Sequence, residues 1–398
     1  MKNERVAVLD IRSYEVTFLI GGSGINNTFI ICGSKSEKYE GYSTEGFLDL
    51  QSLKNAIIST VGSVSQNYEG RIEEIYVSVP SPFMFVKTKG HTISFPSKRK
   101  LSAQDVDALY VSGQNELMQN GRCIRHSAMY FALGDNRKYF DAESLFGVPT
   151  SSLKGALCYY FISEEFYSLV NSVLSGLGIE RVKFIPSSLA QACYLMSEKM
   201  REGYAFLLDV GYLTSTISVV YGSGIVREEN FDCGLGQIIA ALMEQLNIEY
   251  ALAEEMLSFA NVSTGNVPKD DVWTGDDGIT YSVRLINDII KCGLDVLCEK
   301  VDDFLAKYYK DRTMSRFSSN PLMVTGEALT GFAGATEHLS KRLNRLTSVA
   351  YPELPYYDKP QFSSRISLLS MAISDKGKNG LWNKLLNILG GKKRNGKL

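Results

Sequence analysis

Hydrophobic and polar residues follow one another in short runs at the start of the chain, and these runs predict strands joined by tight turns. The expected strands are residues 6–10, 15–20, 28–32 and 75–79. Between the last two, residues 50–67 have a helical pattern, with apolar positions at Leu53, Ile57 and Val61. The segment therefore predicts a mixed α/β unit.

The same order of elements returns near residue 204. Residues 205–209 again form an apolar run that ends in an acid, and a second run, a turn and a helical pattern follow. Leu-Asp-Ile at 9–11 matches Leu-Asp-Val at 208–210, and Gly-Ser-Gly-Ile occurs both at 22–25 and at 222–225. Two matches in register indicate an internal duplication. Two such halves facing each other across a cleft form the architecture of actin, hexokinase and the heat-shock ATPases.

That architecture gives a chemical meaning to the repeated positions. The acids that end the first strand of each half, Asp10 and Asp209, could hold a metal ion through water. The hairpin turns offer backbone N–H groups to phosphates, and a strand at 322–326 would place a glycine turn against an adenosine. Two plainer interpretations stay open. The acids could simply cap turns, and Gly234 and Gly236 could form an ordinary turn rather than a phosphate contact.

Charge is distributed unevenly along the chain. Of 398 residues, 42 are Lys or Arg and 44 are Asp or Glu, so the net charge is −2. Residues 376–398 contain seven basic residues and no acidic one, which leaves 35 basic against 44 acidic residues, or −9, in residues 1–375. This balance argues against nucleic-acid binding by the body and indicates that the tail meets an anionic surface.

Cysteine usage and hydropathy favour a protein of the cytoplasm. The seven cysteines include no Cys-x-x-Cys pair, and we expect buried thiols of a reducing compartment. We see no signal peptide, and no apolar stretch reaches the length of about 18 residues that a spanning helix needs. The histidines His91, His126 and His338 have no partner at metal-ligand spacing, so we expect no metal site there and a structural role for His126.

Five short motifs occur in a fixed order along the chain. They are Leu-Asp-Ile at 9–11, Ile-Pro-Ser-Ser-Leu-Ala at 185–190, Leu-Asp-Val-Gly at 208–211, Cys-Gly-Leu-Gly at 233–236 and Val-Thr-Gly at 324–326. In this order they resemble the bacterial cell-division protein FtsA, a divergent actin. Two further features distinguish that family from most actins: an inserted α/β subdomain, here residues 83–162 with a helix expected after Ser102, and a C-terminal amphipathic helix.

The resemblance implies a duplicated two-domain α/β fold of the actin and heat-shock-ATPase type, with a cleft, an FtsA-type inserted subdomain and a C-terminal amphipathic helix. The implied division is 1–82 and 163–203 for the first actin-like subdomain, which returns at about 345–374; 83–162 for the inserted subdomain; 204–240 and 311–344 for the second actin-like subdomain; 241–310 for a small subdomain; 375–380 for a linker; and 381–398 for a membrane-targeting helix and basic tail.

The resemblance also implies a site for ATP and Mg²⁺. If binding is retained, its residues are Asp10, Arg12, Ser13, Asp209, Gly211, Thr214, Gly234, Gly236, Glu254 and Gly326. Several positions depart from the family pattern. Arg12 and Tyr14 follow the first acid, Leu213 follows the second, Leu257 replaces a lysine, and Glu327 stands at the adenosine turn. An arginine could take over the charge of a metal ion and bind phosphate, but we expect nucleotide binding to be weakened or lost, ATP hydrolysis to be weak or absent, and no residue to be catalytic.

The tail has the pattern of a membrane anchor. Its apolar residues, Leu381, Trp382, Leu385, Leu386, Ile388 and Leu389, fall within an arc of about 160° on a helical wheel. The basic residues Lys392, Lys393 and Arg394 follow. A short amphipathic helix with a tryptophan and a basic cluster suits the surface of an anionic membrane, where each cation adds roughly 1 kcal/mol. Docking of this helix onto the body as ordinary core remains the alternative.

These patterns predict a protein at the cytoplasmic face of the cell membrane that is tethered peripherally. The resemblance to FtsA implies that it attaches the filament of the tubulin homologue FtsZ to the membrane and assembles into filaments itself. The same resemblance places the surface for FtsZ in residues 240–310. One alternative is a binding module similar to the pilus-assembly protein PilM, although such proteins generally lack the amphipathic tail. Another is an active ATPase or sugar kinase of the same superfamily.

Overall fold

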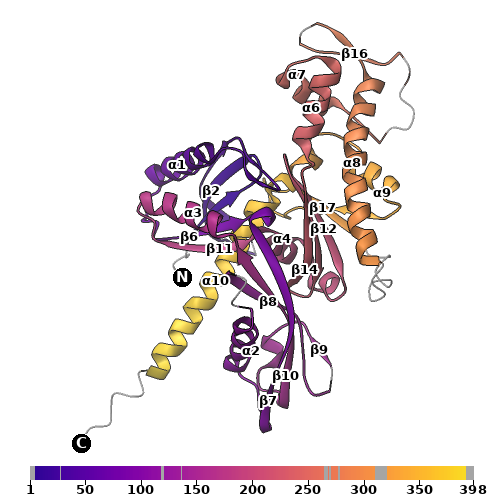
Figure 1. Ribbon diagram of the computed structural model, residues 1–398. Helices are drawn as coiled ribbons and strands as arrows, with labels where there is room; N and C mark the ends of the chain where they lie inside the picture. The colour runs from indigo at the N-terminus through magenta and orange to yellow at the C-terminus, as the bar shows by residue number, and fades with distance from the viewer. Residues whose placement is uncertain are drawn as a thin grey trace, which may run out of the picture.

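Two sheets of the same design form the two halves of the molecule (Figure 1). The structure, a computed structural model, describes residues 5–26, 28–117, 121–135, 137–263, 268, 270–276, 278–309 and 321–390. In each half, three antiparallel strands that are consecutive in the chain are extended by two parallel strands from later in the chain.

The first half contains β1 (Arg5–Ile11), β2 (Glu15–Ser23), β3 (Phe29–Lys38), β6 (Glu74–Val79) and β11 (Arg181–Pro186), in the order β11-β6-β1-β2-β3. Its helices are α1 (Leu50–Asn67), α3 (Glu164–Gly176), α4 (Ser187–Leu195) and α10 (Ser363–Gly390). Successive residues of β1 face opposite sides of the sheet. Leu9 packs in the core with α1 and α3, whereas Val8 packs in the core with α4 and α10. Both faces of this sheet are therefore covered by helices.

The second half contains β12 (Ala205–Val210), β13 (Ser215–Tyr221), β14 (Gly224–Phe231), β17 (Leu322–Thr325) and β18 (Thr347–Val349), in the order β14-β13-β12-β17-β18. β12 takes the place of β1. Asp209 of β12 lies opposite Thr216 of β13, as Asp10 of β1 lies opposite Thr17 of β2. The duplication predicted from the sequence is therefore confirmed at the level of individual residues.

An inserted subdomain separates β6 from α3 in the sequence. It contains β7 (Met84–Lys100), α2 (Ala103–Asn115), β8 (Arg122–Ala132), β9 (Lys138–Tyr139) and β10 (Pro149–Ile162), with the sheet order β7-β10-β8-β9. The side chain of Asp105 accepts the Ser102 backbone N–H at 2.9 Å, which fixes the start of α2. Leu109, Phe131 and Leu157 form a separate core beneath α2, whereas Tyr160 near the end of β10 joins the core of the first half.

A small helical subdomain stands on the second sheet. It contains α6 (Leu235–Leu246), α7 (Tyr250–Phe259), the hairpin of β15 (Val272–Thr274) and β16 (Thr280–Ser282), and α8 (Val283–Tyr309). Shorter elements complete the chain: β4 (Tyr42–Ser43), β5 (Gly46–Phe47), α5 (Glu198–Arg201), α9 (Ala335–Arg342) and the 3-10 turns η1 (Ser81–Phe83), η3 (Glu143–Leu145), η4 (Glu327–Thr330) and η5 (Pro360–Phe362). The small subdomain shares one core with the second sheet, to which Ile290 of α8 and Val324 of β17 both belong.

Two boundaries expected from the sequence are wrong. The sequence indicated a return to the first half at about residue 345, but β18 pairs with the outer edge of β17 in the second sheet, since the duplicated topology needs a fifth strand there. The sequence also indicated a linker at 375–380, but α10 runs through it without a break. Gly377 lowers helix stability by about 1 kcal/mol, which an ion pair of the neighbouring Asp375 with Arg125 helps to offset.

Among the described residues, no helix is long and apolar enough to cross a membrane. All seven cysteines are free thiols. Cys158, Cys233 and Cys298 are buried as expected, but Cys32 and Cys292 are exposed, so the prediction of buried thiols holds only in part.

Candidate functional site

An arginine joins the two halves at the bottom of the cleft. Arg12 follows β1 directly, and its guanidinium donates to both carboxylate oxygens of Asp209, from Nη1 to Oδ2 at 2.5 Å and from Nη2 to Oδ1 at 2.9 Å. Its Nε donates to Oε1 of Glu327 at 3.0 Å. Since Arg12 belongs to the first half and both acids to the second, this three-residue ion cluster ties the halves together.

Burial makes these charges depend on one another. The side chains of Arg12, Asp209 and Glu327 are 13%, 12% and 23% exposed. Burial alone would raise the pKa of Asp209, but Arg12 and a hydrogen bond from Gln191 Nε2 at 2.9 Å hold that pKa below its usual value. Burial raises the pKa of Glu327, and Arg12 opposes this rise. The cluster therefore places a fixed cation where a bound metal ion would be expected.

Asp10 has a different environment from its counterpart Asp209. Its Oδ1 accepts the hydroxyl of Ser364 at 2.8 Å, whereas its Oδ2 is buried without a hydrogen-bond partner within the described part of the chain. Burial raises the pKa of this carboxyl. The two acids expected to act as a pair are therefore separated: one holds Arg12 and the other holds the start of α10.

Backbone N–H groups that a phosphate would need already have partners within the protein. They are Gly211 N with Thr214 O (3.1 Å), Leu213 N with Ser13 Oγ (3.0 Å), Gly234 N with Gln237 Oε1 (2.8 Å), Leu235 N with Gly211 O (3.1 Å) and Gly236 N with Tyr212 O (2.8 Å). Because a phosphate cradle works by offering unpaired N–H groups, a nucleotide would have to break these bonds. The contact from Ser13 also crosses between the halves.

Aromatic rings lie in the cleft beside the ion cluster. The rings of Tyr14 and Tyr212 come from opposite halves and stack with their centroids 4.1 Å apart, and Tyr39 donates its hydroxyl to the Arg12 carbonyl at 2.7 Å. The cavity beside Arg12 and Asp209 has a volume of about 30 Å³. Small-molecule pockets usually measure about 300–1,000 Å³, so this cavity accommodates a water molecule or two but not a nucleotide.

The adenosine side of the site is also altered. Gly326 has φ = 107°, and a Cβ there would lie 2.3 Å from the Val210 carbonyl oxygen, so the turn requires glycine. Glu254 accepts the Tyr250 hydroxyl at 2.7 Å, and that hydroxyl bonds to the Tyr212 hydroxyl at 2.8 Å. Glu254 is therefore linked through two tyrosines to the stacked pair in the cleft.

The ten expected nucleotide-site residues thus line the cleft or connect to it, as the duplicated fold implies. The sequence did not reveal that Arg12 would be neutralised by Asp209 and Glu327. The sequence does contain a signal for this pairing, because a cation and an anion replace small residues at two turns that the fold brings together. The expected membrane residues 381–389 lie in the last turns of α10, whose side chains are not described, and Lys392, Lys393 and Arg394 lie outside the described residues.

Solved structures with the same arrangement cover nearly the whole chain. A PilM–PilN type IV pilus biogenesis complex matches with a TM-score of 0.59 at 11% identity, over 92% of this chain and 98% of that chain. MreB5 of Spiroplasma citri bound to ADP matches with a TM-score of 0.53 at 9% identity, over 94% and 98%. The ethanolamine utilization protein EutJ from Carboxydothermus hydrogenoformans matches with a TM-score of 0.51 at 12% identity, over 93% and 90%.

The chain has the actin-like fold. Identities of 9–12% show this fold and nothing about activity. No protein-family model and no curated protein matches the sequence. Within the described residues, no group of three or more His, Cys, Asp or Glu side chains is placed to hold a metal ion, and His126 stacks on Tyr110 with the ring centroids 4.1 Å apart.

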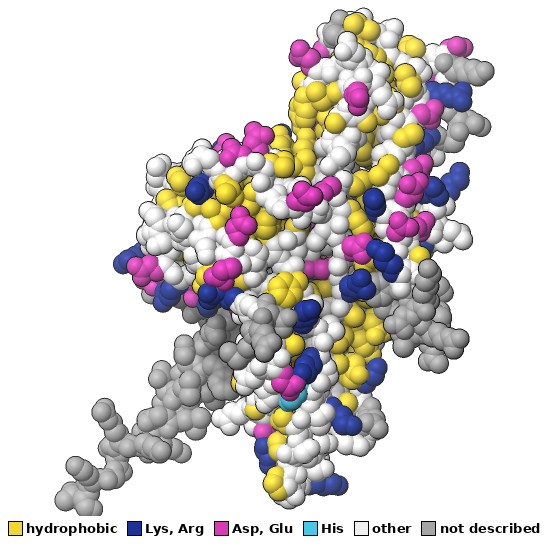
Figure 2. All heavy atoms as spheres, viewed as in Figure 1, with side chains coloured by type: hydrophobic (Ala, Val, Ile, Leu, Met, Phe, Trp, Pro, Cys, Tyr) yellow, Lys and Arg dark blue, Asp and Glu magenta, His cyan; other side chains and the backbone are white. Residues whose placement is uncertain are grey.

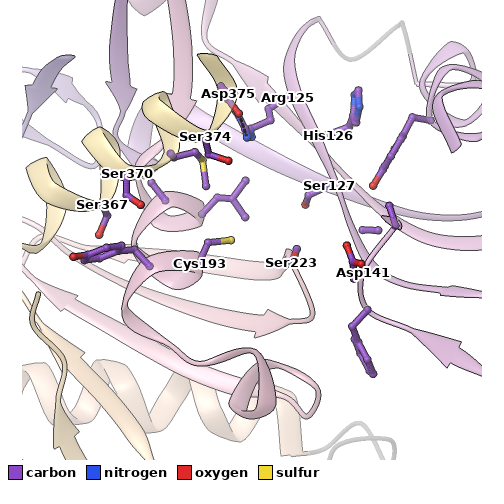
Figure 3. Close-up of a pocket in the computed structure, with 18 of the residues that line it drawn as sticks. Arg125, His126, Ser127, Asp141, Cys193, Ser223, Ser367, Ser370, Ser374 and Asp375 are labelled. Carbon is purple, nitrogen blue, oxygen red and sulfur yellow. Dashed lines mark hydrogen bonds and ion pairs between the residues drawn. The ribbon is translucent and has the colours of Figure 1, made fainter. Parts of the chain in front are cut away.

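A larger hollow of this actin-like fold lies away from the cleft. It has a volume of about 460 Å³ and lies between the inserted subdomain, α4 and α10. Figure 3 shows Ser367, Ser370 and Ser374 of α10 along one side and residues of β8 facing them. Arg125 of β8 donates to both oxygens of Asp375, at 2.6 Å and 2.9 Å, and so closes one end of the hollow.

Two features of this hollow suit a peptide. β8 pairs with β10 on one side, but on its other side it pairs with β9 only at Phe131 and Ala132, so among the described strands the edge from Arg122 to Ser127 forms no ladder with another strand. Ser367 is fully buried, and its hydroxyl has no hydrogen-bond partner in the described structure. This hollow could not be predicted from the sequence, because Arg125 and Asp375 are 250 residues apart.

Proposed function

We propose that this chain is an actin-like membrane tether of the bacterial division machinery, in which a self-closed cleft replaces nucleotide binding. The cluster of Arg12, Asp209 and Glu327 carries this proposal. Three charge-assisted hydrogen bonds at 2.5–3.0 Å hold the halves together, a role that a bound nucleotide and its metal ion would otherwise perform. The body then keeps one shape and acts as a scaffold rather than as an enzyme.

The membrane contact belongs to the C-terminal segment. The helix α10 begins beside the cleft, where Ser363 accepts the Thr325 hydroxyl at 2.7 Å, and it extends beyond the body (Figure 1). The apolar arc and the basic cluster at residues 381–394 suit the surface of an anionic bilayer. A helix fixed to the body at one end, with its apolar arc available to lipid at the other, would keep the body at the membrane surface.

The small subdomain offers a surface for the filament partner, which the FtsA resemblance suggests is FtsZ. Phe259, Val272, Ile279 and Leu285 are each about half exposed, and they lie on or beside the hairpin of β15 and β16. Exposed apolar side chains that gather on one subdomain are typical of a protein–protein contact. Self-assembly into filaments belongs to the same proposal.

Co-sedimentation with anionic vesicles tests this function directly. The full chain should pellet with vesicles. FtsZ should pellet only when the chain and the vesicles are both present, with or without ATP. The matched variant Phe259→Ser with Leu285→Ser should keep the chain on the vesicles and lose FtsZ. Failure of the wild-type chain to bring FtsZ to vesicles would overturn the proposal.

The hollow between β8 and α10 supports a second candidate, a PilM-like binding module for the cytoplasmic tail of a membrane protein. An extended peptide could add a strand to the open edge of β8 and reach Ser367. In that case a peptide with the sequence of the cytoplasmic tail of PilN should bind the wild-type chain. Ser370→Trp, which fills the hollow, should abolish that binding, and Ser370→Ala should not. No binding to the wild type would exclude this candidate for PilN.

A further inference from the structure

A hollow of about 330 Å³ lies at the end of the first sheet opposite the ion cluster, where the parallel strands begin. Its polar lining comes from Arg5 of β1, Tyr68, Arg71 and Glu73 of the segment before β6, Glu74 of β6, Arg181 of β11 and Lys376 of α10. We call it the basic hollow. It is the place where α10 leaves the sheet, since the Lys376 ammonium donates to the Arg5 carbonyl at 2.8 Å.

The charges of the basic hollow do not cancel. Glu73 is neutralised by Arg181 at 2.6 Å, and Glu74 is neutralised by Lys183 at 3.1 Å. Three cations remain without a carboxylate partner among the described residues: Arg5, Arg71 and Lys376. The Arg5 guanidinium lies 5.7 Å from the centre of the Tyr68 ring, which leaves its charge available to an anion.

This positive site stands out because residues 1–375 carry a net charge of −9. An anionic surface repels such a body in most orientations and attracts it where cations gather. Figure 2 shows Lys and Arg side chains interleaved with Asp and Glu side chains along the edge of the half that carries α1 and α3. The apolar arc of the tail begins at Leu381, five residues or about 7.5 Å along α10 from Lys376, so a bilayer that lies along this arc comes close to the hollow.

We propose that the basic hollow binds the phosphate headgroup of an anionic phospholipid. The inference rests on the proposed membrane tethering and adds a second contact, made by the body itself. One contact at the end of a helix would leave the body free to rotate about that helix. Two contacts would fix which face of the actin-like body points away from the membrane.

The experiment is flotation of the full chain with vesicles of phosphatidylglycerol and phosphatidylcholine at low and high salt. Arg5→Glu with Arg71→Glu reverses two cations of the hollow and should weaken vesicle binding at least about tenfold at low salt, because cations near an anionic leaflet attract it and the new carboxylates repel it. The difference should shrink at high salt. The control, Lys300→Glu with Lys341→Glu, makes the same change of charge on exposed helical positions of the second half and should have little effect.

Two further measurements show where the lipid binds and whether a negative result comes from misfolding. Photoactivatable phosphatidylglycerol should cross-link to residues 68–74 in the wild type but not in the double variant, and the single variant Arg71→Gln keeps the test valid if the double variant does not fold. If both double variants weaken binding equally, or if the hollow variant binds as the wild type does, the inference is overturned while tethering through the tail stands. If the wild type binds no vesicles, both fail.

Discussion

Arg12→Ala should lower the free energy of unfolding by about 3–5 kcal/mol at pH 7, as expected when one partner of a buried ion pair is removed. Its three hydrogen bonds to Asp209 and Glu327 lie at 2.5–3.0 Å. At an effective dielectric constant of about 20, one pair of charges at about 4 Å interacts by about 4 kcal/mol. The substitution leaves two carboxylates in a nearly dry cleft without a cation.

A matched variant distinguishes the loss of the attraction to Arg12 from the cost of leaving two buried carboxylates without a cation. Arg12→Met with Asp209→Asn and Glu327→Gln removes all three charges together, so it should lie within about 2 kcal/mol of the wild type. The pH response gives a second check. In Arg12→Ala the pKa values of the two acids rise above their unfolded values, so the loss of stability should be smaller at pH 5 than at pH 7.

Urea unfolding followed by circular dichroism measures these differences. The whole chain is needed, because the cluster joins the two halves, and calorimetry at pH 7 would show whether the halves still unfold together. A loss below about 1 kcal/mol for Arg12→Ala would be typical of a surface ion pair. That result would refute the view that this cluster holds the cleft closed.

Burial raises the pKa of Glu228 to about 7, so the free energy of unfolding should fall by on the order of 3 kcal/mol as the pH rises from about 4.5 to 7. Glu228→Gln should remove this pH dependence in urea unfolding, and an unchanged pH dependence would contradict the prediction. Trp382→Glu with Leu386→Glu should release the protein from anionic vesicles at two salt concentrations without changing the circular dichroism of the body; continued flotation would show that the anchor lies elsewhere. Joining Lys89 to Leu157, which lie opposite each other in β7 and β10, by a short Gly-Ser turn should remove most of the inserted subdomain and leave a folded monomer that no longer self-associates on lipid. Unfolding of that deletion in circular dichroism would refute the claim that the insertion has a core of its own.

The duplicated fold was predictable because it depends on local patterns. Leu9, Asp10 and Leu208, Asp209 repeat at the ends of equivalent strands, and alternation of apolar residues fixes which strands are buried. The departures at Arg12 and Glu327 were also visible as losses of small residues. The sequence shows that small residues are absent at both positions. It does not show that the side chains of Arg12 and Glu327 pair with each other, because that depends on turns 315 residues apart meeting across the cleft.

The features that could not be predicted involve contacts between distant segments. Arg125 and Asp375 are each ordinary surface residues in their own segments, and only the course of α10 along the first sheet brings them together. The linker expected at 375–380 was inferred from its glycines and polar residues. Helix propensity is a weak preference that the packing of the preceding turns overrides.

Titration of the full wild-type chain with Mg-ATP by isothermal calorimetry tests the central claim most directly. If the cluster of Arg12, Asp209 and Glu327 and the stacked tyrosines fill the cleft, no binding tighter than the high-micromolar range should appear, and phosphate release should stay at background. A magnesium-dependent affinity in the low-micromolar range, about −8 kcal/mol, would contradict the account and restore an ATP-dependent actin-like protein.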